Sequence, residues 1–442
     1  MGRAIVIGGG IVGAGIARDL ALRGVAVTLV ERQLPAAGAT GRCHGLLHSG
    51  ARYAVRDPKA AAECASEGPV LKQVAPHCIE DTGGFAIAVT EEDVAYGEKL
   101  LPACRAAGVA AEELPASESP NPGARMCIRT RDAAVDPFLL TLSNLFDARR
   151  HGAEIVCGRG VTHISAGSVR LDDGQSLDAE IVINATGHEC GRLLQRSGLD
   201  PVPVQPDKGT ILVTERRVCA AVISRLRMPA DGDIVVPGHT TSLIGTTSAR
   251  SEDTRPAREE YRQLMREAVT LLPALEGVRI IRAFSGIRPL LGAGDGRGLS
   301  RDFGILEQNG VLTVAGGKLT TYRLIAERAT DAAMKATGER GRCQTKTAPL
   351  PDVRREAPDG PECRCESVGR RIIEMDFLQG ADLSKYNRLG FGTCQGMRCA
   401  KYAASPEAFL QERWKGVRPV LDESQLRQAY ISWAAQRTQH DV

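Results

Sequence analysis

The chain has 442 residues, of which 43% are hydrophobic and 25% charged, a composition typical of a folded protein of two to four domains at about 100–200 residues per domain. The formal net charge is only +3, and no Lys/Arg run interleaved with aromatic residues indicates nucleic-acid binding. No apolar stretch reaches the roughly 18 residues of a membrane span, and the N-terminus runs into a strand-like segment rather than a signal peptide. We therefore expect a cytoplasmic protein whose membrane contact would need a partner.

The first 31 residues show a strand–glycine–helix–strand pattern. An apolar run at 4–7 predicts a buried strand, a helix continues through Leu22 and stops at Arg23-Gly24, and a second strand is expected at 25–30. The periodicity changes from that of a strand to that of a helix and back within this short segment. Such a unit is typical of a nucleotide-binding βαβ fold.

The glycines between the first strand and the helix are spaced as G-x-G-x-x-G. Gly8 permits a tight turn, Gly10 lets the backbone approach a pyrophosphate, and Gly13 with the small Ala17 lets the helix lie close to the strand. The helix N-terminus then faces the phosphate charge. Glu31 ends the second strand, where a carboxylate can accept hydrogen bonds from a ribose diol. The unit predicts dinucleotide binding, and by itself it leaves FAD and nicotinamide open.

Several longer motifs carry a resemblance to a known family. They are GATGRCHGLLHSGARYAV (38–55), VDPFLLT (135–141), SLIGTTS (242–248), SGIRPL (285–290), SRDFGI (300–305), AGGKLTTYR (315–323) and CQGMRC (394–399). Over nearly its whole length, the chain resembles the A-subunit family of the anaerobic, three-subunit FAD-dependent glycerol-3-phosphate dehydrogenases, within the D-amino-acid-oxidase-like flavoproteins. The resemblance implies FAD and an α/β fold: a Rossmann-like FAD-binding domain, an inserted antiparallel-sheet substrate domain, and a small helical C-terminal cysteine module.

The remaining segments agree with this architecture. EIVINATG (180–187) predicts a strand that returns to the nucleotide sheet, and 311–338 predicts a strand, a Gly-Gly turn and a long helix whose N-terminus points at the flavin ring. Thr320 and Thr321 stand where capping residues belong. Alternating runs such as GTILVTE and SLIGTTS predict antiparallel strands. We place the FAD-binding domain at 1–75, 149–199 and 279–340, the substrate cap at 76–148 and 200–278, a linker at 341–362, and the cysteine module with a C-terminal helix at 363–442.

The resemblance implies that sn-glycerol 3-phosphate gives a hydride from C2 to flavin N5 and leaves as dihydroxyacetone phosphate. This chemistry needs cations for a phosphate dianion, a group that accepts the hydroxyl proton, and a pocket that excludes water. Arg288 in SGIRPL is the leading residue because Arg presents a fixed fork of donors, and a core-bridging or surface Arg is the alternative. Arg52, Tyr53, Lys318 and His48 complete the predicted catalytic set, with His48 as one candidate base.

The predicted cofactor contacts are turn glycines, small polar residues that skirt the flavin, and the residues that end the second strand. An ordinary loop is the alternative for the small polar residues. The full set is Gly8, Gly10, Gly13, Glu31, Arg32, Thr40, Gly41, Ser49, Gly50, Gly187, Gly316, Gly317, Thr320 and Thr321.

Nine of the thirteen cysteines are scattered, as is usual for reduced core residues, and four lie close together near the end of the chain. These four are Cys363-x-Cys365 and, after 28 intervening residues, Cys394-x₄-Cys399. Four thiolates suit either zinc or an iron–sulfur cluster. The spacing resembles the bacterioferritin-associated-ferredoxin-like module, with a somewhat shorter gap, and implies a 2Fe–2S cluster. Zinc and uncoordinated redox thiols are the alternatives.

The resemblance also implies partners. Electrons would pass from the flavin through the cluster to electron-transfer and membrane-anchor subunits and indirectly to a quinone, with the chain peripheral to the inner face of the cell membrane. Trp414, in FLQERWKGVRP (409–419), is a candidate docking residue, and packing against the cysteine module is the alternative. Two other functions stay open: an FAD-dependent dehydrogenase of another hydroxy acid or amine, and a non-catalytic electron-transfer subunit that retains FAD.

Overall fold

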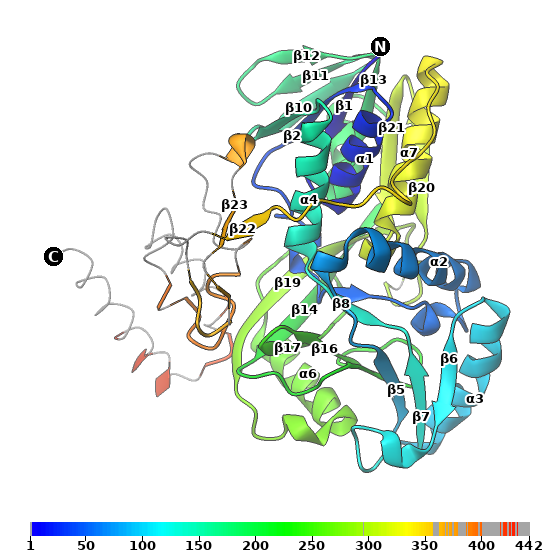
Figure 1. The fold of residues 1–442 in the computed structure, drawn as a ribbon, viewed down its shortest axis with the longest axis vertical. Helices are drawn as coiled ribbons and strands as arrows, with labels where there is room; N and C mark the ends of the chain where they lie inside the picture. Colours follow the sequence, from blue (N-terminus) through cyan, green and yellow to red (C-terminus); the bar gives the residue numbers. More distant parts are fainter. Residues whose placement is uncertain are drawn as a thin grey trace.

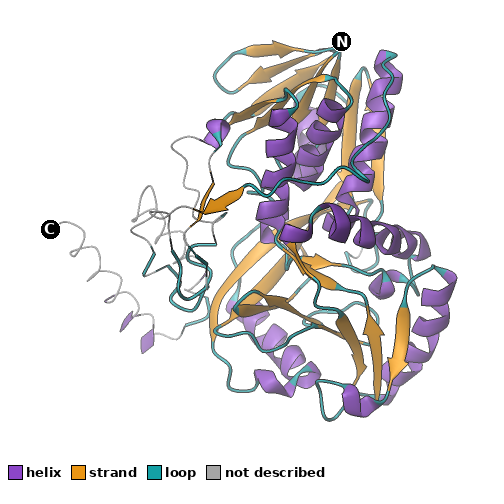
Figure 2. Cartoon of the chain, viewed as in Figure 1, coloured by secondary structure: helices purple, strands orange, loops and turns teal. Residues whose placement is uncertain are grey.

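The computed structural model divides into two halves, each built on its own sheet (Figures 1 and 2). The N-terminal glycine motif lies in the first half, and β22 (Arg354–Glu356) and β23 (Arg371–Ile373) lie at one side of the molecule. The described residues are 2–294, 296–356, 362–366, 368–369, 371–373, 375–378, 386, 388–396, 398–399, 416, 419–421, 424–425, 427–428 and 431.

The first half is built on a six-stranded sheet in the order β20-β21-β13-β1-β2-β9. All neighbouring pairs in this sheet are parallel except β20–β21. Because parallel strands end at the same edge, the turns after β1, β2, β13 and β21 open on one side of the sheet. The strands are β1 (Arg3–Ile7), β2 (Ala26–Glu31), β9 (Glu154–Cys157), β13 (Ile181–Asn184), β20 (Phe303–Gln308) and β21 (Val311–Gly316).

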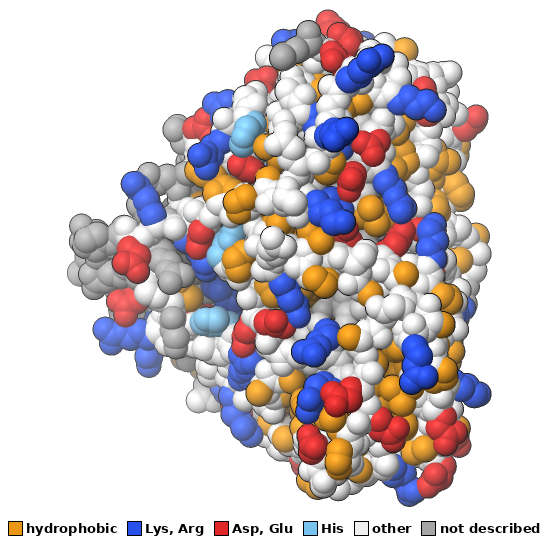
Figure 3. Space-filling view, turned by 45° about the vertical axis from the view of Figure 1, so that its right-hand side comes forward, with side chains coloured by type: hydrophobic (Ala, Val, Ile, Leu, Met, Phe, Trp, Pro, Cys, Tyr) orange, Lys and Arg blue, Asp and Glu red, His pale blue; other side chains and the backbone are white. Residues whose placement is uncertain are grey.

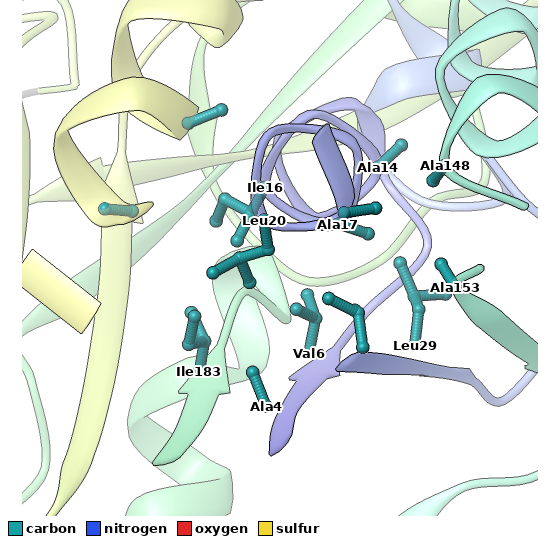
Figure 4. Packing of buried hydrophobic residues seen from close by; sticks show 14 of the residues in the cluster. Ala4, Val6, Ala14, Ile16, Ala17, Leu20, Leu29, Ala148, Ala153 and Ile183 are labelled. Atoms are coloured by element: carbon teal, nitrogen blue, oxygen red, sulfur yellow. The ribbon is translucent and has the colours of Figure 1, made fainter. Parts of the chain in front are cut away.

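Both faces of this sheet are covered. The helices α1 (Ile11–Leu22), α4 (Pro137–Arg150) and α7 (Tyr322–Thr337) pack on one face, and Figure 4 shows the small and branched side chains of α1 against β1, β2 and β13. The other face packs against β10 (Val161–Ser165), β11 (Ser168–Leu171), β12 (Ser176–Asp178) and α5 (Cys190–Arg196). Successive residues of β1 alternate between the two cores, as the period of a strand requires.

The second half is built on a nine-stranded sheet, ordered β18-β14-β17-β16-β15-β5-β7-β6, with β19 paired to the other edge of β14. The helix α6 (Arg258–Leu271) packs on one face and α3 (Glu91–Ala106) on the other. The strands are β5 (Gly84–Ala88), β6 (Ala111–Leu114), β7 (Met126–Thr130), β14 (Val204–Thr214), β15 (Val222–Arg225), β16 (Ile234–Gly238), β17 (Thr241–Gly245), β18 (Ala249–Arg250) and β19 (Ile280–Leu291). The runs GTILVTE and SLIGTTS therefore lie in antiparallel strands, β14 and β17, as predicted.

The position of β19 corrects one predicted boundary. We expected residues 279–340 in the FAD-binding domain, but β19 pairs antiparallel with β14 from Val204↔Leu291 to Thr214↔Ile280. A strand that joined the parallel sheet would need a crossover connection, whereas β19 follows α6 and a short turn and returns directly alongside β14. After β19 the chain returns to the six-stranded sheet, at β20. Arg288 therefore lies on a strand of the cap sheet.

The two halves are joined by α2 (Pro58–Val74) and by a small sheet, β3-β8-β4. The strands of this sheet are β3 (Leu46–Leu47), β4 (Ile79–Glu80) and β8 (Ala133–Val135). Proline at the first position of α2 and the Asp57 side chain, which accepts from Ala60 N at 3.1 Å, define the start of that helix. Short 3₁₀ turns, η1 (Thr40–Arg42), η2 (Ala51–Tyr53) and η7 (Leu319–Thr321), connect these elements at the predicted site.

The described part of the predicted linker is fastened to the first half. Arg18 of α1 is buried, donates to Asp147 at 2.8 Å and reaches the carbonyl of Ala348 at 2.9 Å. Beyond it, β22 (Arg354–Glu356) pairs with β23 (Arg371–Ile373), followed by η8 (Asp376–Leu378). Trp414 lies outside the described residues, as does most of the predicted C-terminal helix.

The described surface carries both signs of charge. Basic and acidic side chains are interspersed over the face drawn in Figure 3. None of the helices within the described ranges has the length and apolar character that crossing a bilayer requires.

Candidate functional site

The turn after β1 separates glycines needed by the fold from one that leaves room for a ligand. Gly8 has φ +109°, and a Cβ on Gly13 would lie 1.9 Å from the carbonyl oxygen of Gly8, so both positions require glycine. A Cβ on Gly10 would approach only Thr40 Oγ1, at 3.3 Å, among the described atoms outside its own helix and neighbours. Gly10 precedes α1 and has no side-chain cap. The free space at this helix N-terminus suits a phosphate.

Glu31 is held beside this turn. Its Oε2 accepts from Gly9 N at 2.6 Å and its Oε1 from Gln33 N at 2.8 Å. A carboxylate has about four acceptor positions, so Glu31 can still accept bonds from a ribose. Arg32 points away from this arrangement: its side chain is 55% exposed and pairs with Glu189 at 2.6 Å. The structure brings Glu31 to the nucleotide turn and leaves Arg32 at the surface.

The loop at 38–50 runs from the nucleotide turn toward the second half. Thr40 Oγ1 accepts from Ile11 N at 3.1 Å, which places it at the start of α1. A Cβ on Gly41 would lie 2.5 Å from the ring of Phe138, and Gly50 has φ +105°. Thr40 therefore faces the predicted cofactor position, whereas the two glycines are required by close packing and backbone conformation.

The turn after β21 also needs its glycines, with φ +81° at Gly316 and +86° at Gly317. The predicted capping role of the following threonines is wrong, because α7 has no side-chain cap bond. Thr320 Oγ1 instead accepts from His48 N at 3.0 Å, and Thr321 Oγ1 donates to Lys318 O at 3.4 Å. Thr320 therefore ties the loop that carries His48 to the start of α7, whereas the Thr321 bond is local. Among the other predicted contacts, Ser49 N donates to Asp132 at 2.7 Å, and Gly187 has φ +64° with open space around it.

Three members of the predicted catalytic set touch one another. Tyr53 Oη lies 3.2 Å from His48 Nε2, and Lys318 Nζ lies 5.2 Å from the centre of the Tyr53 ring. Burial, His44 and the charges of Arg52 and Lys318 hold the pKa of His48 well below its ordinary value. Burial raises the pKa of Tyr53 to about 12. At neutral pH the site therefore holds an uncharged imidazole that can accept a proton and a protonated phenol that orients it.

Arg288 lies beside this group, and most of its guanidinium N–H groups already donate hydrogen bonds to other residues of the chain. Nε donates to Asp207 at 2.6 Å, Nη1 to Thr246 Oγ1 at 2.7 Å, and Nη2 to the carbonyl of Thr247 at 2.7 Å. Burial lowers the pKa of Arg288 to about 10. The clamp role assigned to Arg288 from the sequence remains a prediction, since most of its donors already have partners in the chain.

Two further arginines around the histidines are also paired with aspartates of the cap half. Arg52 Nη2 bonds Asp233 at 2.9 Å, and Asp233 is fully buried. Arg297 bonds Asp231 and the carbonyl of Thr246. Each of these carboxylates offsets one positive charge near the site. The three pairs are Arg52–Asp233, Arg288–Asp207 and Arg297–Asp231.

Two other cations have no carboxylate within ion-pair distance among the described residues. The guanidinium of Arg301 has no hydrogen-bond partner there, and its charge helps to lower the pKa of His48 and opposes the rise in the pKa of Tyr53. Lys318 Nζ bonds the backbone carbonyl of Arg301 at 2.8 Å. Sequence reasoning quoted the motif SRDFGI without singling out Arg301, because the sequence does not show whether an arginine is paired.

His44 was also missed. Its Nδ1 is buried and has no partner among the described atoms, and its ring lies 6.2 Å from that of His48. Burial and the charges of Arg52, Arg288 and Arg301 lower its pKa to about 3. The only signal in the sequence was the recurrence of histidine four positions apart.

The four clustered cysteines come together in two contacting pairs. A hydrogen bond between the thiol groups of Cys363 and Cys399 lowers the pKa of Cys363 to about 6 and raises the pKa of Cys399. The thiol of Cys365 contacts that of Cys394. Cysteine sulfur is the donor that soft metals and iron–sulfur clusters prefer. Among the described residues, however, no group of three or more His, Cys, Asp or Glu side chains is arranged to hold a metal ion.

The cysteine loops are fastened next to the predicted flavin loop. Glu366 is fully buried, pairs with Arg388 at 2.8 Å, and accepts from Thr240 Oγ1 at 2.5 Å. Arg388 also reaches Asp136, the N-cap of α4, at 3.3 Å. The ring of Phe138, which packs against Gly41, lies 5.9 Å from that of Phe391 near the second cysteine loop. Phe138 therefore lies between the loop at Thr40–Arg42 and Phe391, which precedes the second cysteine pair in the chain.

The glycine turn and the acid at the end of β2 indicate a dinucleotide-binding oxidoreductase, and comparison with known proteins identifies the family as flavin-dependent. The model of the family "FAD dependent oxidoreductase" matches residues 3–331. The chain belongs to this family, and FAD is its cofactor. The predicted α/β fold with a Rossmann-like FAD-binding domain is thereby confirmed.

Among curated proteins, the chain is 37% identical to the A subunit of the anaerobic glycerol-3-phosphate dehydrogenase of Escherichia coli K12, covering 98% of this chain and 96% of that protein. The resemblance stated from the sequence is therefore confirmed. Solved structures share the fold. L-proline dehydrogenase from P. horikoshii has a TM-score of 0.66 at 20% identity over 79% of this chain and 96% of that one. L-α-glycerophosphate oxidase from Mycoplasma pneumoniae with FAD bound has a TM-score of 0.65 at 18% identity over 79% and 100%.

Proposed function

We propose that this chain oxidises sn-glycerol 3-phosphate to dihydroxyacetone phosphate with FAD as the acceptor. The observation that carries the proposal is the presence of two cations without a balancing carboxylate. Arg301 and Lys318 lack carboxylate partners among the described residues, and they lie near the uncharged His48. A phosphate monoester carries about −1.5 to −2 charges at neutral pH, whereas a carboxylate carries one. Two uncompensated cations match a phosphorylated alcohol better than a hydroxy acid or an amine. The name of the Escherichia coli relative points to the same substrate.

The chain's own residues have separate roles in this reaction. The turn at Gly10, with Glu31 and Thr40, would hold the cofactor, which when bound supplies the acceptor for the C2 hydride. His48 accepts the proton of the C2 hydroxyl, and Tyr53 fixes the orientation of its ring through the 3.2 Å contact. Since protonated His48 could not accept this proton, its lowered pKa keeps the base competent below neutral pH.

The four cations near His48 have three different roles. Arg301 and Lys318 neutralise the phosphate and hold the substrate in register with His48. Arg288, anchored by Asp207, stabilises negative charge that develops on the C2 oxygen through the donor capacity that its partners leave. Arg52 is oriented by the buried Asp233 and keeps His48 uncharged.

We also propose that Cys363, Cys365, Cys394 and Cys399 hold a 2Fe–2S cluster, which passes electrons singly toward electron-transfer and membrane-anchor subunits and a quinone. The two contacting thiol pairs and the lowered pKa of Cys363 support this assignment. With such partners the chain would lie at the inner face of the cell membrane. The names of its relatives, which mark them as one subunit of several, are consistent with a complex.

Anaerobic titration of the FAD-loaded protein tests the substrate. We expect glycerol 3-phosphate to bleach the flavin absorbance, and glycerol, lactate and proline at the same concentrations to leave it unchanged. Bleaching by a hydroxy acid or an amine would instead identify the alternative dehydrogenase. Oxidised flavin with every compound, in protein that dithionite reduces, would indicate a non-catalytic electron-transfer subunit.

The cluster has its own test. Anaerobically purified protein should contain near two irons and two labile sulfides per chain, as a 2Fe–2S cluster requires. Cys394→Ser should remove the paramagnetic signal that dithionite produces and leave flavin bleaching by substrate intact, because none of the four thiols is among the residues proposed to bind substrate or accept its proton. The matched control is Cys343→Ser, outside the four. Zinc without sulfide would make the module structural instead.

A further inference from the structure

The phosphate-binding cation Arg301 lies at the end of a glycine-rich connection between β19 and β20. Glycine occupies every second position from 292 to 298. Glycine loses more conformational freedom on folding than any other residue, so such a segment is ordered only where other elements hold it. The contacts that hold this loop therefore also determine where Arg301 lies.

Arg56 supplies one set of contacts. Its Nη1 donates to the carbonyl of Arg297 at 2.8 Å, and its Nη2 to the carbonyl of Gly298 at 2.6 Å. Arg56, in the segment that follows η2, thus binds the carbonyl groups of two consecutive residues of the loop. Arg is suited to this because its donors form a rigid fork.

Asp57 supplies a second set, nearer to Arg301. Its Oδ2 accepts from Ser300 Oγ at 2.7 Å and from the backbone N–H of Arg301 at 3.2 Å. Its Oδ1 accepts from Ala60 N and begins α2. One carboxylate thus joins the start of a helix to the peptide group of the phosphate-binding cation.

Both residues are tied to the proton-accepting side of the site. The backbone N–H groups of Arg56 and Asp57 donate to the carbonyl of Tyr53, at 3.0 and 2.7 Å. Tyr53 in turn contacts His48. From the opposite side, Lys318 donates to the carbonyl of Arg301. The segment 56–57 therefore links the phosphate cation to the Tyr53–His48 pair through short, direct bonds.

We propose that Arg56 and Asp57 form a clip that positions Arg301, setting the span between the phosphate cation and the proton-accepting His48. The clip rests on the proposed function for its substrate, but its hold on the loop does not. Neither residue touches substrate in this arrangement, so both are positioning residues. Arg301 should bind phosphate well only while the hydrogen bonds of Arg56 and Asp57 to the loop are formed.

Asp57→Asn is the decisive substitution. Asparagine keeps the size of the side chain and still caps a helix, yet it has one oxygen and cannot accept from Ala60, Ser300 and Arg301 as the carboxylate does. The matched control is Lys59→Ala, which breaks an exposed ion pair with Asp302 at 2.6 Å between the same two segments. An exposed pair of this kind contributes little.

Two measurements follow for the FAD-loaded protein. Hydrogen exchange should quicken at the amides of 296–302 in Asp57→Asn and stay as in the wild type in Lys59→Ala. With glycerol 3-phosphate, Asp57→Asn should lower kcat/KM by about tenfold, mainly through KM, while Lys59→Ala stays within about twofold. In an Arg301→Met background, adding Asp57→Asn should change kcat/KM by less than about twofold, because the clip then has no cation to position.

The outcomes are separable. Equal exchange in wild type and Asp57→Asn would overturn the clip, whatever the substrate is. A tenfold loss that persists in the Arg301→Met background would show that Asp57 acts by another route and would also overturn it. If glycerol 3-phosphate does not bleach wild-type flavin, the proposed function fails, and the exchange data alone decide whether Asp57 holds the loop.

Discussion

The proposed cofactor edge and the proposed substrate site of this protein would meet their ligands by different means. At the cofactor edge, the backbone would approach the ligand, and what matters is the absence of a side chain at Gly10. At the proposed substrate site, what matters is which positive charges are neutralised by a neighbouring carboxylate. Arg52, Arg288 and Arg297 are each paired with an aspartate, whereas Arg301 has no carboxylate partner among the described residues. A backbone site is therefore destroyed by adding atoms, and a charge site by changing the balance between neighbours.

The largest expected effect comes from adding atoms at the cofactor edge. We expect Gly10→Val to give folded protein with little FAD, because the branched side chain would fill the space at the α1 N-terminus that a pyrophosphate needs. Gly38→Ala is the matched control, since a Cβ there meets no atom within 4 Å and its φ is not positive. The flavin-to-protein ratio measures the result, and full flavin content in Gly10→Val would contradict the assignment.

A balanced charge should respond differently from an unbalanced one. Arg288→Leu would leave the Asp207 carboxylate, 3% exposed, without its cation. Removing one partner of a buried pair typically costs about 3–5 kcal/mol of folding free energy, so we expect a clear fall in the unfolding midpoint along with lost activity. Adding Asp207→Asn, which can still accept from Ser248, should restore most of the stability and none of the activity. An unchanged midpoint in Arg288→Leu would show that the pair is not a structural unit.

The unbalanced cation should show the opposite behaviour. Arg301→Met removes a guanidinium that has no partner among the described residues, so we expect stability to change by less than about 0.5 kcal/mol. Loss of charge-assisted bonds worth about 1.5–3 kcal/mol should lower kcat/KM for glycerol 3-phosphate roughly tenfold to hundredfold. Steady-state kinetics with a dye acceptor, alongside thermal unfolding, checks both parts. Wild-type kinetics in Arg301→Met would remove Arg301 from the phosphate site.

The same division decides what the sequence could predict. The glycine turn and Glu31 lie within one short unit, so their spacing alone is enough to predict a cofactor edge there. The pocket depends on partners far apart in the chain: Arg288 and Asp207 are separated by 81 positions, and only the pairing of β14 with β19 brings them together. For the same reason the boundary at 279 was placed wrongly.

Local rules also failed where a distant partner competed for the same group. Thr320 stands at a helix start, where a capping bond was expected, but its oxygen accepts from His48 N. His44 and Arg301 were overlooked because their importance lies in having no partner among the described residues, a property visible only once the chain has folded. Motifs therefore indicated the chemistry, whereas the assignment of roles within the pocket needed three-dimensional neighbours.

The smallest expected effect follows from the uncharged histidines. The folded pKa of His44 is lowered to about 3, whereas in the unfolded chain it is about 6.5. Below that unfolded value the unfolded chain binds a proton that the folded protein does not, so acidification favours unfolding. The stability contributed by neutral His44 is complete above about pH 6.5 and falls by about 2 kcal/mol at pH 5. His44→Leu cannot bind the proton in either state, so its urea midpoint should fall less than that of the wild type between pH 7.5 and 5. His163→Leu, at a half-buried position on β10 outside this site, is the matched control. If wild type and His44→Leu lose the same stability over this range, His44 does not stay neutral in the folded site, and the cations around it are more screened than their positions indicate.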